Sequence, residues 1–194
     1  TLAGIGVGGQ GNQNMIRLQR LGEVQVVAVC DVNRQGDGYL SWNWSQGNET
    51  GKAGREPARQ EIERLYAQQK GQGNYKGCQT YADYRELLDQ EGVDAVMVAT
   101  PDHTHAVVTM AALKRGKHVY CEKPLTYSVH EARQVTEAAR QAGVATQLGN
   151  QGQASDKARL VQEYILDGAL GPVREVHVMF GPPFWDQPKW AKQP

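Results

Sequence analysis

Residues 2–11 read Leu2-Ala3-Gly4-Ile5-Gly6-Val7-Gly8-Gly9-Gln10-Gly11, an apolar run that passes directly into a glycine-rich loop. The segment from Leu2 to Val7 predicts a buried β-strand. A helix is predicted from Asn12 to Leu21, because apolar side chains recur there at helical spacing and Gly22 follows as a stop signal. The glycines therefore lie where a strand turns into a helix, at the spacing Gly-x-Gly-x-x-Gly.

This spacing predicts a dinucleotide site. Gly6 permits the tight turn, Gly8 lets a pyrophosphate approach the backbone, and Gly11 lets the helix pack against the strand. Gly9 and Gln10 complete the loop, where unpaired N–H groups and the positive end of the helix dipole face the phosphates.

Asp31 ends the next predicted strand, Glu23 to Cys30, at about the 20-residue distance from Gly11 that this fingerprint expects. A carboxylate at that position accepts hydrogen bonds from the adenosine ribose hydroxyls and repels a 2′-phosphate. The sequence therefore predicts NAD as the cofactor. Arg34 lies close by and could accommodate a 2′-phosphate, so NADP stays open as an alternative.

Strand-like and helix-like segments alternate along the rest of the chain. Further strands are predicted over Val93–Thr100, His118–Cys121 and Val144–Leu148, and helices over Ala58–Gln69, Thr80–Asp89, the segment from Thr104 to about Gly116, Ser128–Ala142 and a segment that begins at Ser155 or Asp156. This alternation is typical of a parallel sheet with crossover helices. The predicted fold class is α/β, with a Rossmann-type doubly wound parallel sheet.

The stretch from Asn33 to Pro57 departs from this rhythm. It is rich in Gly, Ser, Asn and Gln, yet it carries Trp42 and Trp44. A loop of this length inside a compact domain is usually functional or disordered, and the aromatic residues favour a packed flap. Trp42 or Trp44 could serve as a lid or as an oligomer contact, and the sequence does not decide between them.

A second departure lies near the end of the chain, where apolar and polar residues alternate from Val173 to Phe180. Alternation is typical of a strand with one solvated face, so a different kind of sheet is expected to begin there. We therefore predict a cofactor-binding domain over residues 1–149. Residues 150–194 are predicted to form a linking helix and the first strand of an incomplete C-terminal, antiparallel α/β domain.

Two strand ends carry the residues that suggest chemistry. Thr100-Pro101-Asp102-His103-Thr104-His105 follows one buried strand, and Glu122-Lys123-Pro124 follows the next. Ligands of parallel sheets bind at the carboxyl ends of the strands, so both segments should face one crevice. A lysine beside a cationic nicotinamide loses proton affinity and could polarise a substrate hydroxyl and assist its proton transfer. Glu122 could fix the lysine or hold a ribose hydroxyl.

The run Val93–Pro101, then His105, then Gly116–Pro124, together with the glycine loop and Asp31, resembles the glucose–fructose oxidoreductase / inositol dehydrogenase / rhizopine-catabolism (Gfo/Idh/MocA) family. The resemblance covers the chain from its start to about Asn150. It implies an NAD(P)-binding Rossmann domain followed by a largely antiparallel domain that shapes a sugar site and forms homo-oligomers.

The resemblance also implies roles for individual residues. It makes Lys123 the catalytic or substrate-orienting lysine. The further cofactor contacts that it implies are Thr100, Pro101, His105, Glu122 and Asn150. The family usually supplies an Asp and a His from a later helix of the second domain. This sequence ends before such a segment, so Lys123 is expected to be half of an active site.

The activity that the resemblance implies is hydride transfer between NAD(P) and a hydroxyl-bearing carbon of a sugar, cyclitol or related polyol. Two alternatives stay open. One is an NAD-dependent glycosidase or eliminase on the same scaffold. The other is a non-catalytic dinucleotide-binding sensor, against which the intact Glu122-Lys123-Pro124 motif argues.

The composition of the chain excludes some classes of binding partner. The formal net charge is +0, with lysines and arginines scattered, so no nucleic-acid partner is predicted. No apolar stretch approaches the ~18 residues that suggest a membrane span.

His103 and His105 form an H-x-H pair, but no third ligand has supporting spacing, so no metal site is predicted. The chain begins at Thr1, and localisation stays open between cytoplasmic and, if a signal preceded Thr1, exported.

Cys30, Cys78 and Cys121 lie far apart in the sequence, and no pair of them has the spacing of a zinc site. Two of them fall in strand-like runs. We therefore predict that all three are small buried hydrophobic residues rather than metal ligands or nucleophiles.

Overall fold

A computed structural model describes residues 1–40, 50–69 and 77–179 of the chain. The chain divides into two compact units, Thr1–Asn150 and Gln151–Pro194.

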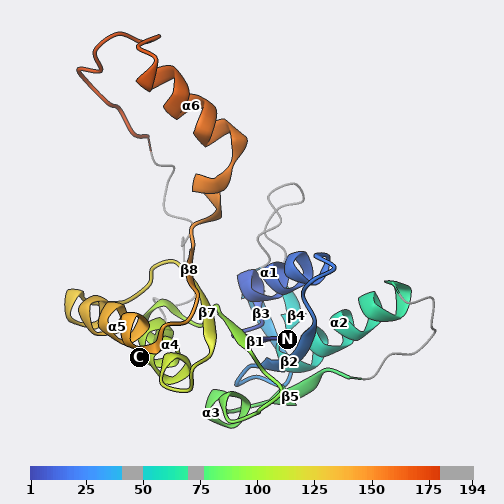
Figure 1. Ribbon diagram of the computed structural model, residues 1–194. Coiled ribbons are helices and arrows are strands. Elements are labelled where there is room, and N and C mark those ends of the chain that lie inside the picture. Colours follow the sequence, from blue (N-terminus) through green and yellow to red (C-terminus); the bar gives the residue numbers. More distant parts are fainter. Residues whose placement is uncertain (41–49, 70–76, 180–194) are drawn as a thin grey trace, which may run out of the picture. The chain divides into compact units, whose positions relative to one another are not determined.

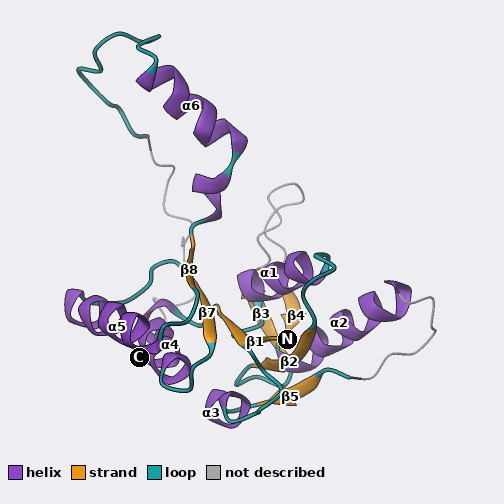
Figure 2. Ribbon diagram, in the orientation of Figure 1, coloured by secondary structure: helices purple, strands orange, loops and turns teal. Residues whose placement is uncertain are grey.

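Six strands of the described residues form a parallel sheet in the first unit (Figures 1 and 2). They are β1 (Leu2–Ile5), β2 (Val26–Cys30), β5 (Gln79–Tyr81), β6 (Ala95–Val98), β7 (His118–Glu122) and β8 (Thr146–Gly149). Their order across the sheet is β5-β2-β1-β6-β7-β8. This order reverses direction between β1 and β6, which is the switch point of a Rossmann fold. The predicted doubly wound parallel sheet is confirmed.

Helices cover both faces of this sheet (Figure 1). They are α1 (Gly9–Gln19), α2 (Arg55–Gln69), α3 (Tyr84–Leu88), α4 (His105–Leu113) and α5 (Val129–Ala142). Successive residues of β6 point to opposite faces. Met97 packs in the cluster under α1 and α2, whereas Val96 and Val98 pack in the cluster under α3, α4 and α5. Both faces are therefore apolar, which explains the continuous hydrophobic runs of the strands.

Two helix starts show how local sequence places an element. Helix α5 begins with a capping box, in which the Ser128 hydroxyl accepts the Glu131 N–H and the Glu131 carboxylate accepts the Ser128 N–H. In contrast, α1 begins at Gly9 rather than at the predicted Asn12. The last residues of the glycine loop are already helical, so the first turn of α1 is part of the loop.

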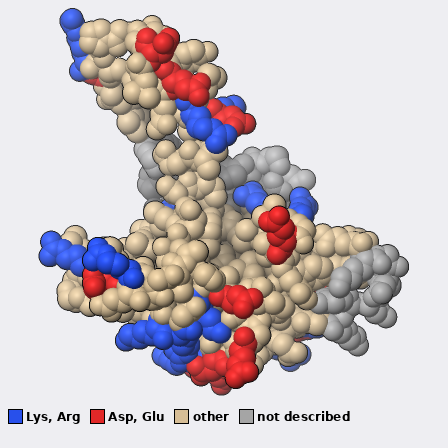
Figure 3. Space-filling model, in the orientation of Figure 1, with Lys and Arg blue, Asp and Glu red and all other residues tan. Residues whose placement is uncertain are grey.

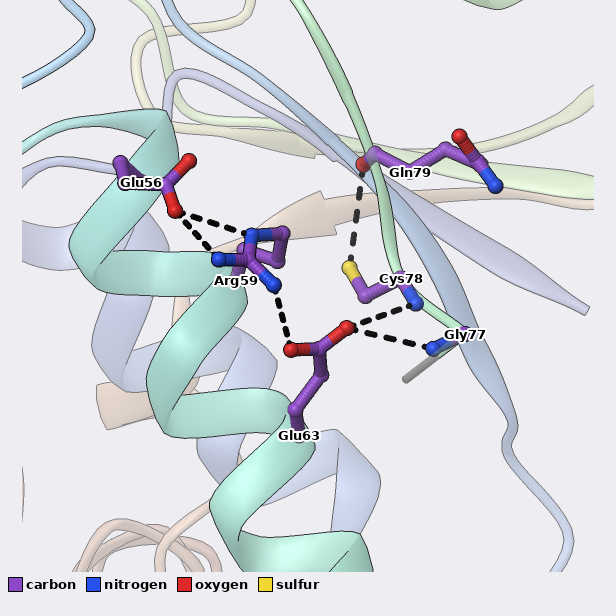
Figure 4. Close-up of polar contacts among 6 residues, drawn as sticks. All are labelled: Glu56, Arg59, Glu63, Gly77, Cys78 and Gln79. Atoms are coloured by element: carbon purple, nitrogen blue, oxygen red, sulfur yellow. Dashed lines mark hydrogen bonds and ion pairs between the residues drawn. The ribbon is translucent and has the colours of Figure 1, made fainter. Parts of the chain in front are cut away.

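The predicted helix over Thr80–Asp89 is wrong in its first residues, because the chain forms strand β5 there. The helix itself is confined to α3. A strand of three residues has too few positions to show a period of two, so it is defined by its neighbours. It pairs with β2, and α2 holds the segment that leads into it (Figure 4). Glu63 Oε1 accepts the N–H groups of Gly77 at 3.2 Å and Cys78 at 3.5 Å, while Arg59 binds Glu63 through its other carboxylate oxygen.

A second correction concerns the predicted loop over Asn33–Pro57. Residues Gly36–Leu40 (β3) and Thr50–Ala53 (β4) pair as antiparallel strands, and α2 already begins at Arg55. Pro57 is tolerated because it lies in the first turn, where a backbone N–H has no helical partner. Trp42 and Trp44, assigned to a flap, lie outside the described residues.

The second unit contains the short 3₁₀ helix η2 (Gln151–Ala154) and the helix α6 (Asp156–Leu166). Of the two predicted starts, Ser155 is the N-cap of α6, since its Oγ accepts the Ala158 N–H at 3.2 Å. The strand predicted over Val173–Phe180 is not formed within 173–179, the part that the structure describes. A strand requires a hydrogen-bonded neighbour, and alternation of residue types does not supply one.

Among the described helices, none is both long and apolar enough to cross a bilayer. On the face shown in Figure 3, lysine and arginine side chains lie next to aspartate and glutamate side chains in several places.

Candidate functional site

The register of the sheet brings the ends of four strands to one edge. Ile5 on β1 pairs with Cys30 on β2 and with Val98 on β6, and Val98 pairs with Cys121 on β7. The segments that follow are the glycine loop, the Asp31 turn, the Thr100-Pro101 turn and the Glu122-Lys123-Pro124 turn. The predicted site segments therefore share the carboxyl edge of the sheet, where Rossmann folds bind their ligands.

The glycine loop is pressed against the end of β6. Gly6 has a φ of +80°, and a Cβ atom there would lie 2.6 Å from the carbonyl carbon and oxygen of Ala99. A Cβ atom on Gly11 would lie 1.8 Å from the carbonyl oxygen of Gly6. Both positions therefore admit only glycine, which agrees with the roles predicted for them.

A cavity of about 600 Å³ opens beside this loop, between the ends of β1, β2 and β6. Its walls bring together many of the residues predicted to bind cofactor: Gly6, Gly8, Gly9, Asp31, Thr100 and Pro101. Ala82 and Tyr84, which follow β5, also line it and were not predicted. Their place at the cavity could be predicted only by identifying β5 in the sequence, and three residues are too few to show the alternating pattern of a strand.

The cavity fits a dinucleotide in two respects besides its volume. Gly8 is the N-cap of α1 and provides no side-chain cap, so the first N–H groups of this helix are available to an anion. Thr100 Oγ1 is buried and has no hydrogen-bond partner among the described residues. A buried hydroxyl without a partner is costly, and a bound polar ligand would satisfy it.

Asp31 is held at the edge of this cavity. It is 8% exposed, its Oδ2 accepts the Val7 N–H at 3.2 Å, and its Oδ1 accepts the Asn33 N–H at 3.0 Å. Arg55 Nη1 donates to the Asp31 carbonyl at 2.9 Å and to the Val32 carbonyl at 3.0 Å. The carboxylate is thus tied to the glycine loop, and an arginine from α2 that the sequence did not indicate holds the turn around it.

Glu122 is linked to α1 rather than to solvent. It is 5% exposed, and its Oε1 accepts a hydrogen bond from Asn14 Nδ2. Asn14 Oδ1 in turn accepts from Gln10 Nε2 at 2.8 Å. Gly149 leaves room for the carboxyl group, since a Cβ there would lie 2.8 Å from Glu122 Cδ. The network connects the first turn of α1 to the residue that precedes Lys123, and sequence reasoning missed Asn14.

His105 begins α4 and is 1% exposed. Its Nδ1 lies 2.5 Å from the Pro124 carbonyl oxygen, and its Nε2 lies 2.8 Å from the Thr100 carbonyl oxygen. Burial by itself lowers the pKa of this imidazole. The interaction with Cys121 and the hydrogen bonds with the two carbonyl groups outweigh burial and raise the pKa to about 9.

Lys123 is exposed at the end of β7, and Asn150 is exposed at the end of β8. Neither residue lines the 600 Å³ cavity, and neither do Glu122 and His105. The catalytic role of Lys123 and the cofactor contacts of Glu122, His105 and Asn150 therefore stay predictions.

The three cysteines are free and buried, as predicted. Cys30 borders the cavity, but burial and then the negative charges of Asp31 and Asp83 raise its pKa to about 12. Cys30 is consequently a thiol near neutral pH and a poor nucleophile. In the part of the chain that the structure describes, no group of three or more His, Cys, Asp or Glu residues could hold a metal ion.

Comparison with known proteins gives consistent relatives. The chain is 38% identical to 1,5-anhydro-D-fructose reductase from Ensifer adhaerens over 101 positions, which cover 50% of this chain and 30% of the relative. Inositol 2-dehydrogenase from Rubrobacter xylanophilus is 35% identical over 102 positions, or 52% of this chain and 29% of the relative.

The fold has solved counterparts as well. The crystal structure of myo-inositol 2-dehydrogenase from Lactobacillus plantarum superposes with a TM-score of 0.63 and 21% identity, over 89% of this chain and 42% of that one. At this identity the likeness concerns the fold alone. The matches thus span less than half the length of each of these relatives.

A family model described as "Oxidoreductase family, NAD-binding Rossmann fold" matches residues 42–150, more than half of the chain. The glycine loop and Asp31 lie before the matched residues, and the sheet register joins them to the same site. The chain therefore belongs to the Gfo/Idh/MocA family of NAD-binding oxidoreductases.

Proposed function

We propose that the protein transfers hydride between NAD and a hydroxyl-bearing carbon of a sugar, cyclitol or related polyol. The observation that carries the proposal is the cavity between the glycine loop, Asp31 and the Thr100-Pro101 turn, on the sheet edge where Lys123 follows β7. The relatives that act on inositol and on 1,5-anhydro-D-fructose support this class of substrate. Assembly into a homo-oligomer is part of the same proposal.

The residues would divide the work as follows. The N–H groups at the start of α1 bind the phosphates, and Asp31 accepts hydrogen bonds from the ribose hydroxyls of the adenosine. Bound NAD supplies the hydride chemistry. Lys123 hydrogen-bonds the substrate hydroxyl and polarises it, while the hydroxyl proton passes to the Asp/His pair that the family supplies from its second domain. Glu122 positions Lys123 from the preceding residue through its bond to Asn14.

The direct test mixes the full-length protein with NAD and a panel of sugars, cyclitols and polyols. The proposal expects NADH to form with at least one member of the panel. Glycoside cleavage or elimination without net NADH would instead favour a glycosidase or eliminase that uses NAD transiently. Tight dinucleotide binding with no turnover on any compound would favour a sensor.

Asp31→Asn should distinguish the two dinucleotides. The change removes the charge but keeps an oxygen that can accept one of the two backbone N–H groups, from Val7 or Asn33. A hydrogen bond to a charged group contributes about 1.5–3 kcal/mol, so we expect the Kd for NAD to rise about tenfold to a hundredfold. The Kd for NADP should stay level or fall, because repulsion of the 2′-phosphate is removed.

Isothermal titration with both dinucleotides measures this change. Asp89→Asn is the matched control, since Asp89 pairs with Arg115 on the surface at the end of α3. An equal loss of affinity for NAD and NADP in Asp31→Asn would contradict the ribose role and indicate damage to the loop.

A further inference from the structure

The imidazole of His105 joins two turns that are separate in the sequence. The Thr100 carbonyl belongs to the turn after β6, and the Pro124 carbonyl belongs to the turn after β7 that carries Lys123. Both ring nitrogens lie within hydrogen-bond distance of a carbonyl oxygen. The ring is 1% exposed, so water does not compete for either contact.

This geometry selects one protonation state. A carbonyl oxygen only accepts hydrogen bonds, and a neutral imidazole has a single N–H. In the neutral ring, one nitrogen lone pair would face an oxygen lone pair across 2.8 Å or less. The doubly protonated ring donates to both oxygens, so both ring nitrogens and both carbonyl oxygens have a hydrogen-bond partner.

We propose that His105 is a positioning residue which, as an imidazolium ion, ties the Thr100 carbonyl to the Pro124 carbonyl and so fixes the turn that carries Lys123. The catalytic consequence rests on the proposed function. The protonation state and the link between the two turns do not, and they can be measured without substrate.

The surroundings of the ring are consistent with a cation. Burial and the N-terminal end of α4 both disfavour a positive charge, but the interaction with Cys121 and the hydrogen bonds with the Pro124 and Thr100 carbonyls raise the pKa of His105 to about 9. The ionisable residues on the elements around the ring are His118, Tyr120, Cys121 and Glu122 on β7, Lys123 in the following turn, and Asp102 and His103 in the 3₁₀ helix η1 (Asp102–Thr104).

The direction of the pH dependence follows from this pKa. His105 binds its proton more tightly in the folded protein than in the unfolded chain, where its pKa is about 6.5. The link therefore contributes its full stability below pH 6.5. The contribution is lost as the pH rises from there through about 9.

The first experiment is NMR of the imidazole nitrogens of His105 in the full-length protein without substrate, from pH 6 to about pH 10. We expect both nitrogens of His105 to be protonated at pH 7, and one proton to be lost with a midpoint near pH 9. A neutral ring at pH 7 would overturn the proposal, whatever the protein does to sugars.

The second experiment compares His105→Phe, which keeps a flat ring without hydrogen bonds, with His105→Gln, which keeps an amide donor. Thr109→Val is the matched control, because Thr109 is also buried on α4 but its Oγ1 has no hydrogen-bond partner among the described residues. If His105 positions Lys123, kcat should fall about tenfold to a hundredfold in His105→Phe. The Kd for NAD should stay within about threefold, and His105→Gln should recover part of kcat.

The midpoint of urea unfolding gives a readout that does not need activity. The difference between wild type and His105→Phe should be largest near pH 6 and should shrink toward pH 10. A difference of equal size at both pH values would mean that His105 acts only as packing, which would overturn the proposal. Failure of the sugar panel alongside the expected NMR and unfolding results would count against the proposed function alone.

Discussion

Lys123→Met should lower kcat by about 10²- to 10⁴-fold while the Kd for NAD stays within about threefold. Loss of a positioned general acid or base has an effect of this size, and methionine keeps the length of the side chain while removing its charge. Lys123 is exposed and lies outside the 600 Å³ cavity, so its removal should not disturb the dinucleotide. Steady-state kinetics on the substrate found with the panel, together with NAD titration, measure both quantities.

Lys114→Met serves as the control for this experiment. Lys114 is an exposed lysine at the C-cap of α4, away from the carboxyl edge of the sheet, and its replacement makes the same chemical change. Its kcat should be that of the wild type. A Lys123→Met enzyme with unchanged kcat would remove Lys123 from the mechanism. A parallel loss of NAD affinity would mean that the lysine supports the cofactor site rather than the reaction.

Gly11→Ala should abolish NAD binding and destabilise the first unit by about 3 kcal/mol or more. Two effects oppose one another here. Alanine is favoured over glycine inside a helix by about 1 kcal/mol, and Gly11 lies in the first turn of α1. The added methyl group, however, would lie 1.8 Å from the Gly6 carbonyl oxygen, which belongs to the backbone and cannot rotate away. The collision is therefore expected to dominate.

Gly22→Ala is a matched control, because a Cβ on Gly22 would meet nothing within 4 Å. Its free energy of unfolding should change by less than about 1 kcal/mol. Urea unfolding and NAD titration of both variants test the prediction. If Gly11→Ala unfolded at the same urea concentration as Gly22→Ala and bound NAD normally, the close packing of the loop against the start of α1 would be wrong.

Several features of the fold were predictable because they depend on neighbours in the sequence. The β-branched residues of Val26–Cys30 and Ala95–Val98 mark strands that are buried on both faces, and the Ser128 capping box marks the start of α5. The three-residue strand β5 and the β3–β4 hairpin were not predictable in this way. Each is defined by hydrogen bonds to another strand, and neither has a periodic pattern of its own.

The candidate site also combines features that the local sequence predicts with contacts that only the folded chain shows. The glycine spacing and Asp31 pointed to a dinucleotide, and the structure places both on one cavity. The side-chain contacts that hold the site residues in place were not predicted, because they join parts of the chain that are distant in the sequence. Asn14 reaches Glu122 across 108 positions, and Arg55 reaches the Asp31 carbonyl across 24. No spacing rule predicts pairs of this kind.

The sequence by itself determined that this protein has a doubly wound sheet with a glycine loop, and that Lys123 follows a buried strand. Those properties reside in local periodicity and in the spacing of a few residues. Only the tertiary structure decided that His105 lies between the Thr100 and Pro124 carbonyls, which lie in the turns that follow the neighbouring strands β6 and β7. The physical reason is that the parallel register of β6 and β7 sets which distant groups meet, and hydrogen bonds form only between groups that meet.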